Sequence, residues 1–98
     1  MNVRLSKRAQ RAVSRIDDRW RKRGDHPETF LRELLATIDY LESVESPGTP
    51  CPTEKHPTLK RLLLEKSKCH VYFEMNEREQ LLEVLTVWDG RRERSPRL

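Results

Sequence analysis

The apolar residues of this chain change their spacing once, and this change restricts what the chain can fold into. Apolar side chains recur at helical spacing between residues 7 and 43, whereas from residue 59 onward they follow the period of two that is typical of β-strands. The chain has 98 residues, which is enough for one hydrophobic core but not for two. Helices followed by strands around one core predict a single α+β domain covering residues 1–98.

Two helices are expected in the first half of the chain. Ser6 can cap the first helix, over residues 7–23, and Gly24 can end it. Asp25 and Glu28 are spaced like a capping box at the start of the second helix. Packed as an antiparallel hairpin, the helices can bury their apolar stripes. The stripes consist of Ala9, Ala12, Val13, Ile16 and Trp20, and of Phe30, Leu31, Leu34, Leu35, Ile38 and Leu41.

Strands are expected in the second half, after a loop. Four of the six prolines fall in residues 46–57, and proline disfavours both helix continuation and strand pairing, so this segment is expected to be extended and unpaired. Three strands follow at 59–65, 70–75 and 81–88, joined by short turns as an antiparallel meander. The last is apolar at most positions, which is typical of a strand covered on both faces. A short edge strand is expected at residues 2–5.

The expected fold is therefore a two-layer α+β domain in the order β-α-α-β-β-β, with the helical hairpin packed on an antiparallel sheet. The hairpin can cover only one face of that sheet. The other face keeps Leu, Tyr and Trp side chains that so small a domain cannot bury with its own helices. This uncovered face predicts a docking surface for another chain.

The charges are unevenly distributed, although the net charge is only +4. Residues 1–23 carry +7 and the basic tail 91–98 carries +3, whereas residues 24–50 carry −5. Basic segments of this kind attract an acidic partner or a phosphate backbone. A solvated helix face followed by a loose tail has the same composition, so both interpretations stay open.

The composition indicates a cytoplasmic protein without a metal or cofactor. No apolar run is long enough to span a membrane, and residues 1–5 do not open a secretory signal, so no membrane association is expected. Cys51, His56, Cys69 and His70 could in number bind zinc. However, Cys69 and His70 are neighbours on one predicted strand and would point to opposite faces. We therefore expect no metal site and no cofactor.

Three segments of the sequence resemble one protein superfamily. They are VRLSKRA at residues 3–9, RLLLEKSKCHVYF at 61–73 and VLTVWDGRR at 84–92. In this order and spacing they are similar to the first strand and helix start, the middle strands, and the last strand with its basic tail in the RelE/ParE superfamily of bacterial toxins, on the ParE side. The sequence departs from that pattern at Cys69, where relatives usually carry an aromatic residue, and at Asp89, where many carry His.

The resemblance implies the RelE/ParE-like fold and a type II toxin–antitoxin pair, in which a small antitoxin wraps the toxin in a hetero-oligomer and blocks it. ParE-like relatives poison DNA gyrase, and RelE-like relatives cleave messenger RNA in the ribosome. On this sequence the expected antitoxin contacts are Tyr72, Leu63 and Trp88. The expected target contacts are Trp88, Arg91, Arg92, Arg94 and Arg97.

A ribonuclease would need a base for the 2′-hydroxyl, a donor for the leaving oxygen and cations for the phosphate. We interpret His70 as a structural residue and Asp89 as a turn residue, which leaves no convincing acid–base pair. A toxin that inhibits DNA gyrase by protein binding is therefore favoured. A RelE-like endoribonuclease and a non-toxic protein- or nucleic-acid-binding module are the alternatives. The ribonuclease candidates are His70, Arg61, Lys60, Asp89, Arg91 and Arg92.

Overall fold

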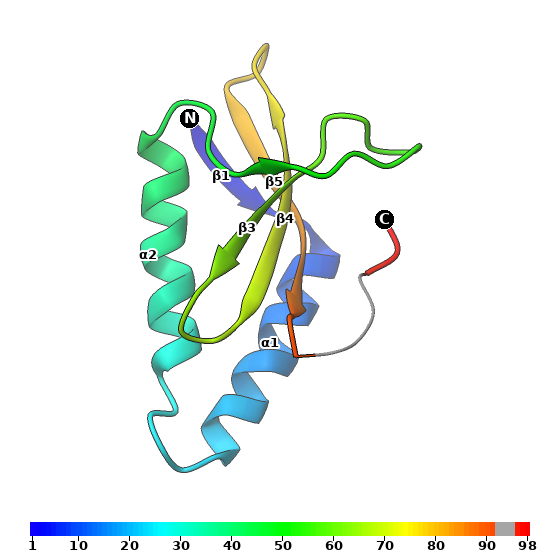
Figure 1. Cartoon of the computed structure of the whole chain (residues 1–98). Coiled ribbons are helices and arrows are strands. Elements are labelled where there is room, and N and C mark those ends of the chain that lie inside the picture. The colour runs from blue at the N-terminus through cyan, green and yellow to red at the C-terminus, as the bar shows by residue number, and fades with distance from the viewer. Residues whose placement is uncertain (92–95) are drawn as a thin grey trace.

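The computed structural model describes residues 1–91 and 96–98 and confirms an α+β domain, with two helices packed on one face of a five-stranded sheet (Figure 1). Within the described residues, no helix is both long and apolar enough to cross a lipid bilayer. The elements in chain order are β1 (Asn2–Leu5), α1 (Lys7–Lys22), α2 (Thr29–Ser43), β2 (Thr49–Pro50), β3 (Lys60–Leu64), β4 (Cys69–Asn76) and β5 (Leu81–Asp89).

The strand order in the sheet is β1-β5-β4-β3-β2. The expected antiparallel meander of β3, β4 and β5 is confirmed. The edge strand β1 pairs parallel to β5, with Val3 opposite Leu82, so the sheet is mixed rather than purely antiparallel. The segment between β1 and β5, which contains both helices and strands β2 to β4, provides the long connection that a parallel pair requires, but nothing in the local sequence of β1 indicates its direction.

The proline-rich segment is not wholly unpaired, contrary to the sequence expectation. Thr49 and Pro50 form β2, which pairs antiparallel with Arg61 and Lys60 of β3. Pro50 is tolerated because β2 is the outer edge of the sheet, where a strand can do without one of its N–H donors. Residues 51–58 then form a loop that extends away from α2 (Figure 1).

The helix ends follow from local chemistry in one case and not in the other. Ser6 caps α1 as expected: its Oγ accepts the Ala9 N–H at 3.0 Å and donates to the Leu85 carbonyl of β5 at 2.8 Å. The predicted capping box at Asp25 and Glu28 is wrong, since α2 begins only after Glu28, which makes no side-chain cap. Pro27 disfavours helical backbone in the residue before it, and His26 has a φ of +50°.

A β-bulge explains the dense apolar pattern of β5. Tyr72 pairs with Thr86 and Phe73 pairs with Val84, so Leu85 is an extra residue on β5. The inward-facing positions therefore shift by one along the strand, and Val87 faces the core although it is three residues after Val84. The strand is not fully covered on both faces as the pattern suggested, because Leu81, Leu85 and Trp88 remain only half-buried.

One core joins the two layers. The buried stripe residues of both helices pack against apolar residues of β3, β4 and β5, with Phe30 and Phe73 at 0% exposure. A second attachment is polar. The Glu33 carboxylate on α2 accepts the backbone N–H groups of Lys66 and Ser67 at 2.7 and 2.9 Å, and the Ser67 hydroxyl at 2.8 Å. Glu33 thereby anchors α2 to the turn between β3 and β4.

Candidate functional site

The predicted antitoxin contacts Leu63, Tyr72 and Trp88 lie on the face of the sheet opposite the helices, which we call the outer face. Side chains alternate between the two faces of a strand, and Val71 and Phe73 of β4 point into the core. Their neighbours His70 and Tyr72 therefore face outward. With their partners on β3 and β5 they form two neighbouring cross-strand rows, Leu63–His70–Trp88 and Arg61–Tyr72–Thr86.

The residues of the outer face differ strongly in exposure. Leu63 is 44% exposed, one of three large apolar side chains that are exposed among the described residues. His70 and Trp88 are half-buried, whereas Tyr72 is only 5% exposed, and its ring centroid lies 6.3 Å from that of His70. The expectation that this face leaves its Tyr uncovered is therefore wrong, because Tyr72 lies on the central strand β4 between Arg61 and Thr86 and is buried there. Leu63 offers a partner the most surface of the three predicted antitoxin contacts.

The candidate catalytic residues do not share one site. Arg61 and His70 lie on the outer face. Lys60 is opposite Phe73, and Asp89 is opposite the buried Cys69, which places both on the side of the sheet that faces the helices. The sheet therefore separates these four candidates into two pairs, and the described residues bring together no general acid with a general base around one position.

His70 has the environment of a structural histidine. Its Nδ1 atom is buried and has no hydrogen-bond partner among the described residues. Burial lowers the pKa of His70 below its ordinary value, and the positive charge of Arg61 lowers it further. The imidazole is therefore neutral near pH 7, which makes it a poor proton donor. A Cβ added at Gly90 would overlap the Lys68 carbonyl and would lie 3.1 Å from His70 Nε2, so the last turn closes tightly over this ring.

Asp89 serves the turn that follows β5, as the sequence analysis favoured. Its Oδ1 accepts the Arg91 backbone N–H at 3.0 Å and the Arg91 Nε at 3.2 Å. Burial opposes ionisation of Asp89, but the hydrogen bonds and charge of Arg91 outweigh burial and hold the pKa of Asp89 below its ordinary value. A carboxylate in this state cannot donate a proton at neutral pH.

The basic residues of the C-terminal segment continue toward α1. The Arg91 guanidinium carbon lies 5.7 Å from the Trp20 ring centroid, and that of Arg23 lies 4.7 Å from the same centroid. A small hollow separates the middle of α1 from the end of β5, and arginines of α1 border it beside the predicted contact Trp88. It is lined by Ala12, Arg15, Ile16, Arg19, Val87, Trp88 and Asp89.

The other predicted target contacts are only partly described. Arg97 is exposed. Arg92 and Arg94 lie outside the described residues. Of the five residues predicted to contact the target, the structure thus places two near α1: Trp88 borders the hollow beside Arg15 and Arg19, and Arg91 lies over the Trp20 ring.

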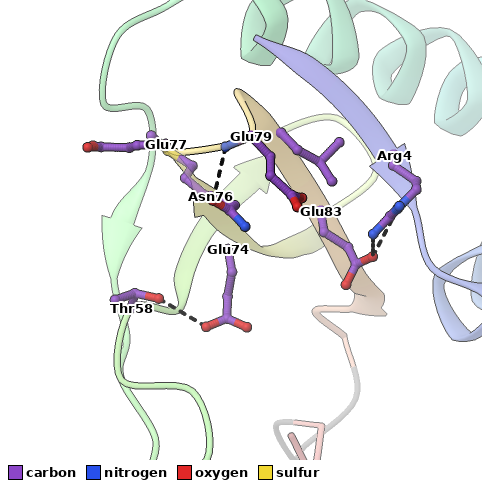
Figure 2. A pocket seen from close by; sticks show the side chains of 9 residues that line it. Arg4, Thr58, Glu74, Asn76, Glu77, Glu79 and Glu83 are labelled. Carbon is purple, nitrogen blue, oxygen red and sulfur yellow. Dashed lines mark hydrogen bonds and ion pairs between the residues drawn. The ribbon is translucent and has the colours of Figure 1, made fainter.

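An acidic hollow, which no sequence motif indicated, lies toward the β4–β5 turn (Figure 2). Two of its carboxylates already have partners: Glu74 is bound by His56 Nδ1 at 2.7 Å and by the Thr58 hydroxyl at 3.0 Å, and Arg4 pairs with Glu83 at 2.8 Å. No group of residues in segments 1–91 and 96–98 has the geometry of a metal site. The lining residues, which come from strands and a loop far apart in sequence, are Arg4, Thr58, Glu74, Met75, Asn76, Glu77, Glu79, Leu81 and Glu83.

No protein-family model matches this chain, and no curated protein matches it either. The resemblance to the RelE/ParE superfamily therefore stays a prediction that depends on three segments of the sequence. The function of the outer face and of the C-terminal turn is therefore inferred from the residues that form them.

Proposed function

We propose that this protein is a ParE-like toxin of a type II toxin–antitoxin system, that it inhibits DNA gyrase by binding it, and that a small cognate antitoxin neutralises it by covering the outer face. The observation that supports this proposal most is the outer face itself. Both helices pack on the opposite side, and Leu63 is left 44% exposed in the middle of a strand, where an apolar side chain gains from being covered.

The arrangement of the candidate catalytic residues favours binding over chemistry. Cleavage of RNA requires a base and an acid on either side of one phosphate. His70 and Asp89 face opposite sides of the sheet, and Asp89 is held ionised by Arg91. One observation favours the endoribonuclease alternative, because Arg61 and His70 share the outer face and could together hold a phosphate. A cation beside a neutral imidazole still lacks a proton donor for the leaving oxygen.

The charges of the outer face restrict how an antitoxin segment can lie on it. The row of Leu63 is bordered by Arg61, whereas the end near the β4–β5 turn carries Glu74 and Glu83. An acidic-to-mixed helical segment fits if its apolar side chains cover Leu63 and its acidic side chains lie toward Arg61 and away from the glutamates. Salt should slow the association of such a segment more than it weakens the finished complex.

Purified protein is expected to inhibit the supercoiling of relaxed plasmid by DNA gyrase, or to trap cleaved plasmid, and its expression is expected to arrest growth. His70→Ala should leave both effects unchanged in protein that circular dichroism shows to be folded, because the proposal gives the imidazole a structural role and no chemical one. Codon-biased cuts in translated messages that disappear in His70→Ala would instead support the endoribonuclease. Normal growth on expression would contradict any toxin and support a non-toxic binding module.

Leu63→Asp is expected to weaken antitoxin binding by roughly 30-fold or more, since a covered leucine contributes about 2 kcal/mol and a buried unpaired carboxylate opposes binding further. The antitoxin to use is the product of a small acidic reading frame adjacent to the gene. Leu35→Asp is the matched control, because Leu35 is 56% exposed but lies on α2, away from the outer face. Titration calorimetry measures the antitoxin affinity of both variants. Equal losses, or a larger loss for Leu35→Asp, would place the antitoxin elsewhere.

A further inference from the structure

The exposed side of α1 carries a dense row of positive charge. The helix packs on the sheet through Ala9, Ala12, Ile16 and Trp20, which all lie on one side of it. At 3.6 residues per turn, six basic residues project from about one third of the circumference on the other side. All six are exposed, and α1 lies at the periphery of the molecule (Figure 1). They are Lys7, Arg8, Arg11, Arg15, Arg19 and Lys22, and we call them the basic face of α1.

Little of this charge is neutralised by the rest of the chain, where Asp89 is the acidic residue whose charge reaches Arg19. None of the ion pairs found within residues 1–91 and 96–98 involves a residue of the basic face. The ion pair on α1 joins Arg21 to Asp17 on a different side of the helix, and Asp18 is the one acidic residue within the basic face. Six cations beside one carboxylate, held on a rigid helix, create a strong local positive potential.

The chemistry between these cations argues for phosphate rather than protein as the partner. Gln10 and Ser14 lie at one edge of the basic face and share a shallow surface hollow with Lys7, Arg11 and Arg15. The Gln10 amide donates to the Leu5 carbonyl at 3.0 Å, so the Ser14 hydroxyl is the polar donor offered beside these cations. The stable core of a protein interface needs aromatic or aliphatic anchors. The large apolar side chains that the described residues expose are Leu35, Tyr40 and Leu63, and none of them is on α1. Phosphate oxygens need only cations and polar hydrogen-bond donors, which is what this face offers.

The form of the nucleic acid follows from the aromatic residues. Proteins that hold single strands stack the bases on exposed aromatic rings. The one aromatic residue of α1, Trp20, is 9% exposed and lies on the side that packs against the sheet. On α1 the basic face therefore has cations about 6 Å apart along the helix, at every fourth residue, but no ring on which a base could stack. The ring of Trp88, which borders the hollow at the end of β5, is itself half-buried. A duplex, with its bases already stacked, requires no such ring.

We propose that the basic face of α1 binds the phosphate backbone of double-stranded nucleic acid without reading its base sequence. The surface continues beyond α1, because Arg15 and Arg19 border the hollow at the end of β5 and Arg91 lies over Trp20 at the end of α1. The backbone of a duplex can thus run along the helix toward the C-terminal turn. This inference uses only the basic face and its surroundings, and it stands whether or not the protein inhibits gyrase.

The test measures binding of the full chain to a 20-base-pair DNA duplex, by fluorescence anisotropy, as a function of salt. Neutralising about five phosphates predicts a slope of log affinity against log salt of about −4.5. Arg11→Gln/Arg15→Gln should reduce the magnitude of that slope by about 1.8, because it removes two phosphate contacts. The conservative variant Arg11→Lys/Arg15→Lys keeps the charge and should keep the slope.

The matched control is Arg4→Gln/Arg32→Gln, which removes the same charge outside α1. Arg4 and Arg32 are paired with Glu83 and Glu28, so this variant should bind DNA like the wild type. Equal losses in both double glutamine variants would overturn the proposal, because they would show attraction by net charge alone. A circular-dichroism spectrum with an unchanged thermal midpoint confirms that each variant is folded.

Further ligands in the same assay distinguish double-stranded nucleic acid from other possible partners of the basic face. A matched RNA duplex shows which source of duplex phosphate is preferred, and binding of either duplex supports the proposal. A single-stranded oligonucleotide should bind more weakly than the duplex. Polyglutamate stands for an acidic protein, and tighter binding of polyglutamate than of duplex would overturn the proposal. Salt-sensitive self-association in sedimentation, without binding to any duplex, would likewise overturn it and assign the basic face to a second copy of the chain.

Discussion

Alanine in place of Gly48 is expected to destabilise the protein by about 3 kcal/mol, whereas alanine in place of Gly24 is expected to cost about 1 kcal/mol. The two glycines have nearly the same backbone conformation, with φ of +83° and +80°, so the conformational part of the effect is shared. A Cβ at Gly24 would meet no atom within 4 Å. A Cβ at Gly48 would lie 2.7 Å from Cζ of Phe73 and 3.1 Å from the Arg61 carbonyl.

The difference between the two glycine variants therefore measures steric overlap with a ring that is 0% exposed and cannot swing into solvent. Urea denaturation followed by circular dichroism provides both free energies of unfolding. Replacing the Phe73 ring by the smaller leucine side chain should relieve the overlap. The double variant Gly48→Ala/Phe73→Leu should therefore lose less free energy of unfolding than the two single variants lose together. Equal destabilisation by the two glycine variants, or additive effects in the double variant, would contradict the close packing of Gly48 on Phe73.

Glu33→Gln is expected to reduce the free energy of unfolding at pH 7 by about 2 kcal/mol, because an amide cannot accept the three hydrogen bonds from Lys66 and Ser67 as a carboxylate does. Burial opposes ionisation of Glu33, but these hydrogen bonds outweigh it and lower the pKa of Glu33 below its ordinary value. A lowered pKa in the folded state means that the stabilisation is present above the ordinary glutamate pKa of about 4.3 and is lost as the pH falls through the folded value.

The free-energy difference between wild type and Glu33→Gln should therefore shrink as the pH is lowered from 7 to 3. Chemical denaturation at several pH values measures this difference. Glu45→Gln serves as the control, since Glu45 is exposed and lies just beyond the end of α2, and it should change stability by less than about 0.5 kcal/mol at any pH. A constant difference across the pH range would show that Glu33 does not anchor α2 through its charge.

The candidate site was only partly predictable from sequence. The resemblance and the strand pattern placed Leu63, His70 and Trp88 on candidate strands, and the register of the sheet brings these three into one row. Their exposure was not predictable, because it depends on what other segments cover. That Lys60 and Arg61 face opposite sides of the sheet was predictable, because neighbouring residues on a strand alternate between its two faces. The separation of His70 from Asp89 depends on strand pairing, which a local pattern does not specify.

The basic face of α1 could be predicted from the sequence of that helix alone. Its residues repeat along one helix, so their spacing alone predicts that they share a side, and the apolar stripe predicts which side is buried. That this face continues to Trp88 and Arg91 could not be predicted, because residues more than 65 positions apart meet there through the packing of α1 on β5.

By itself, the sequence determined the order of the helices and of the four longer strands, because each is encoded in the periodicity of a short segment. The tertiary structure alone decided the parallel pairing of β1, the pairing of Pro50 at the sheet edge, and the bulge at Leu85. It also decided that Tyr72 is buried while Leu63 stays exposed. The physical reason is the same in each case: these features depend on contacts between segments distant in the chain, and such contacts leave no periodic signal in either segment.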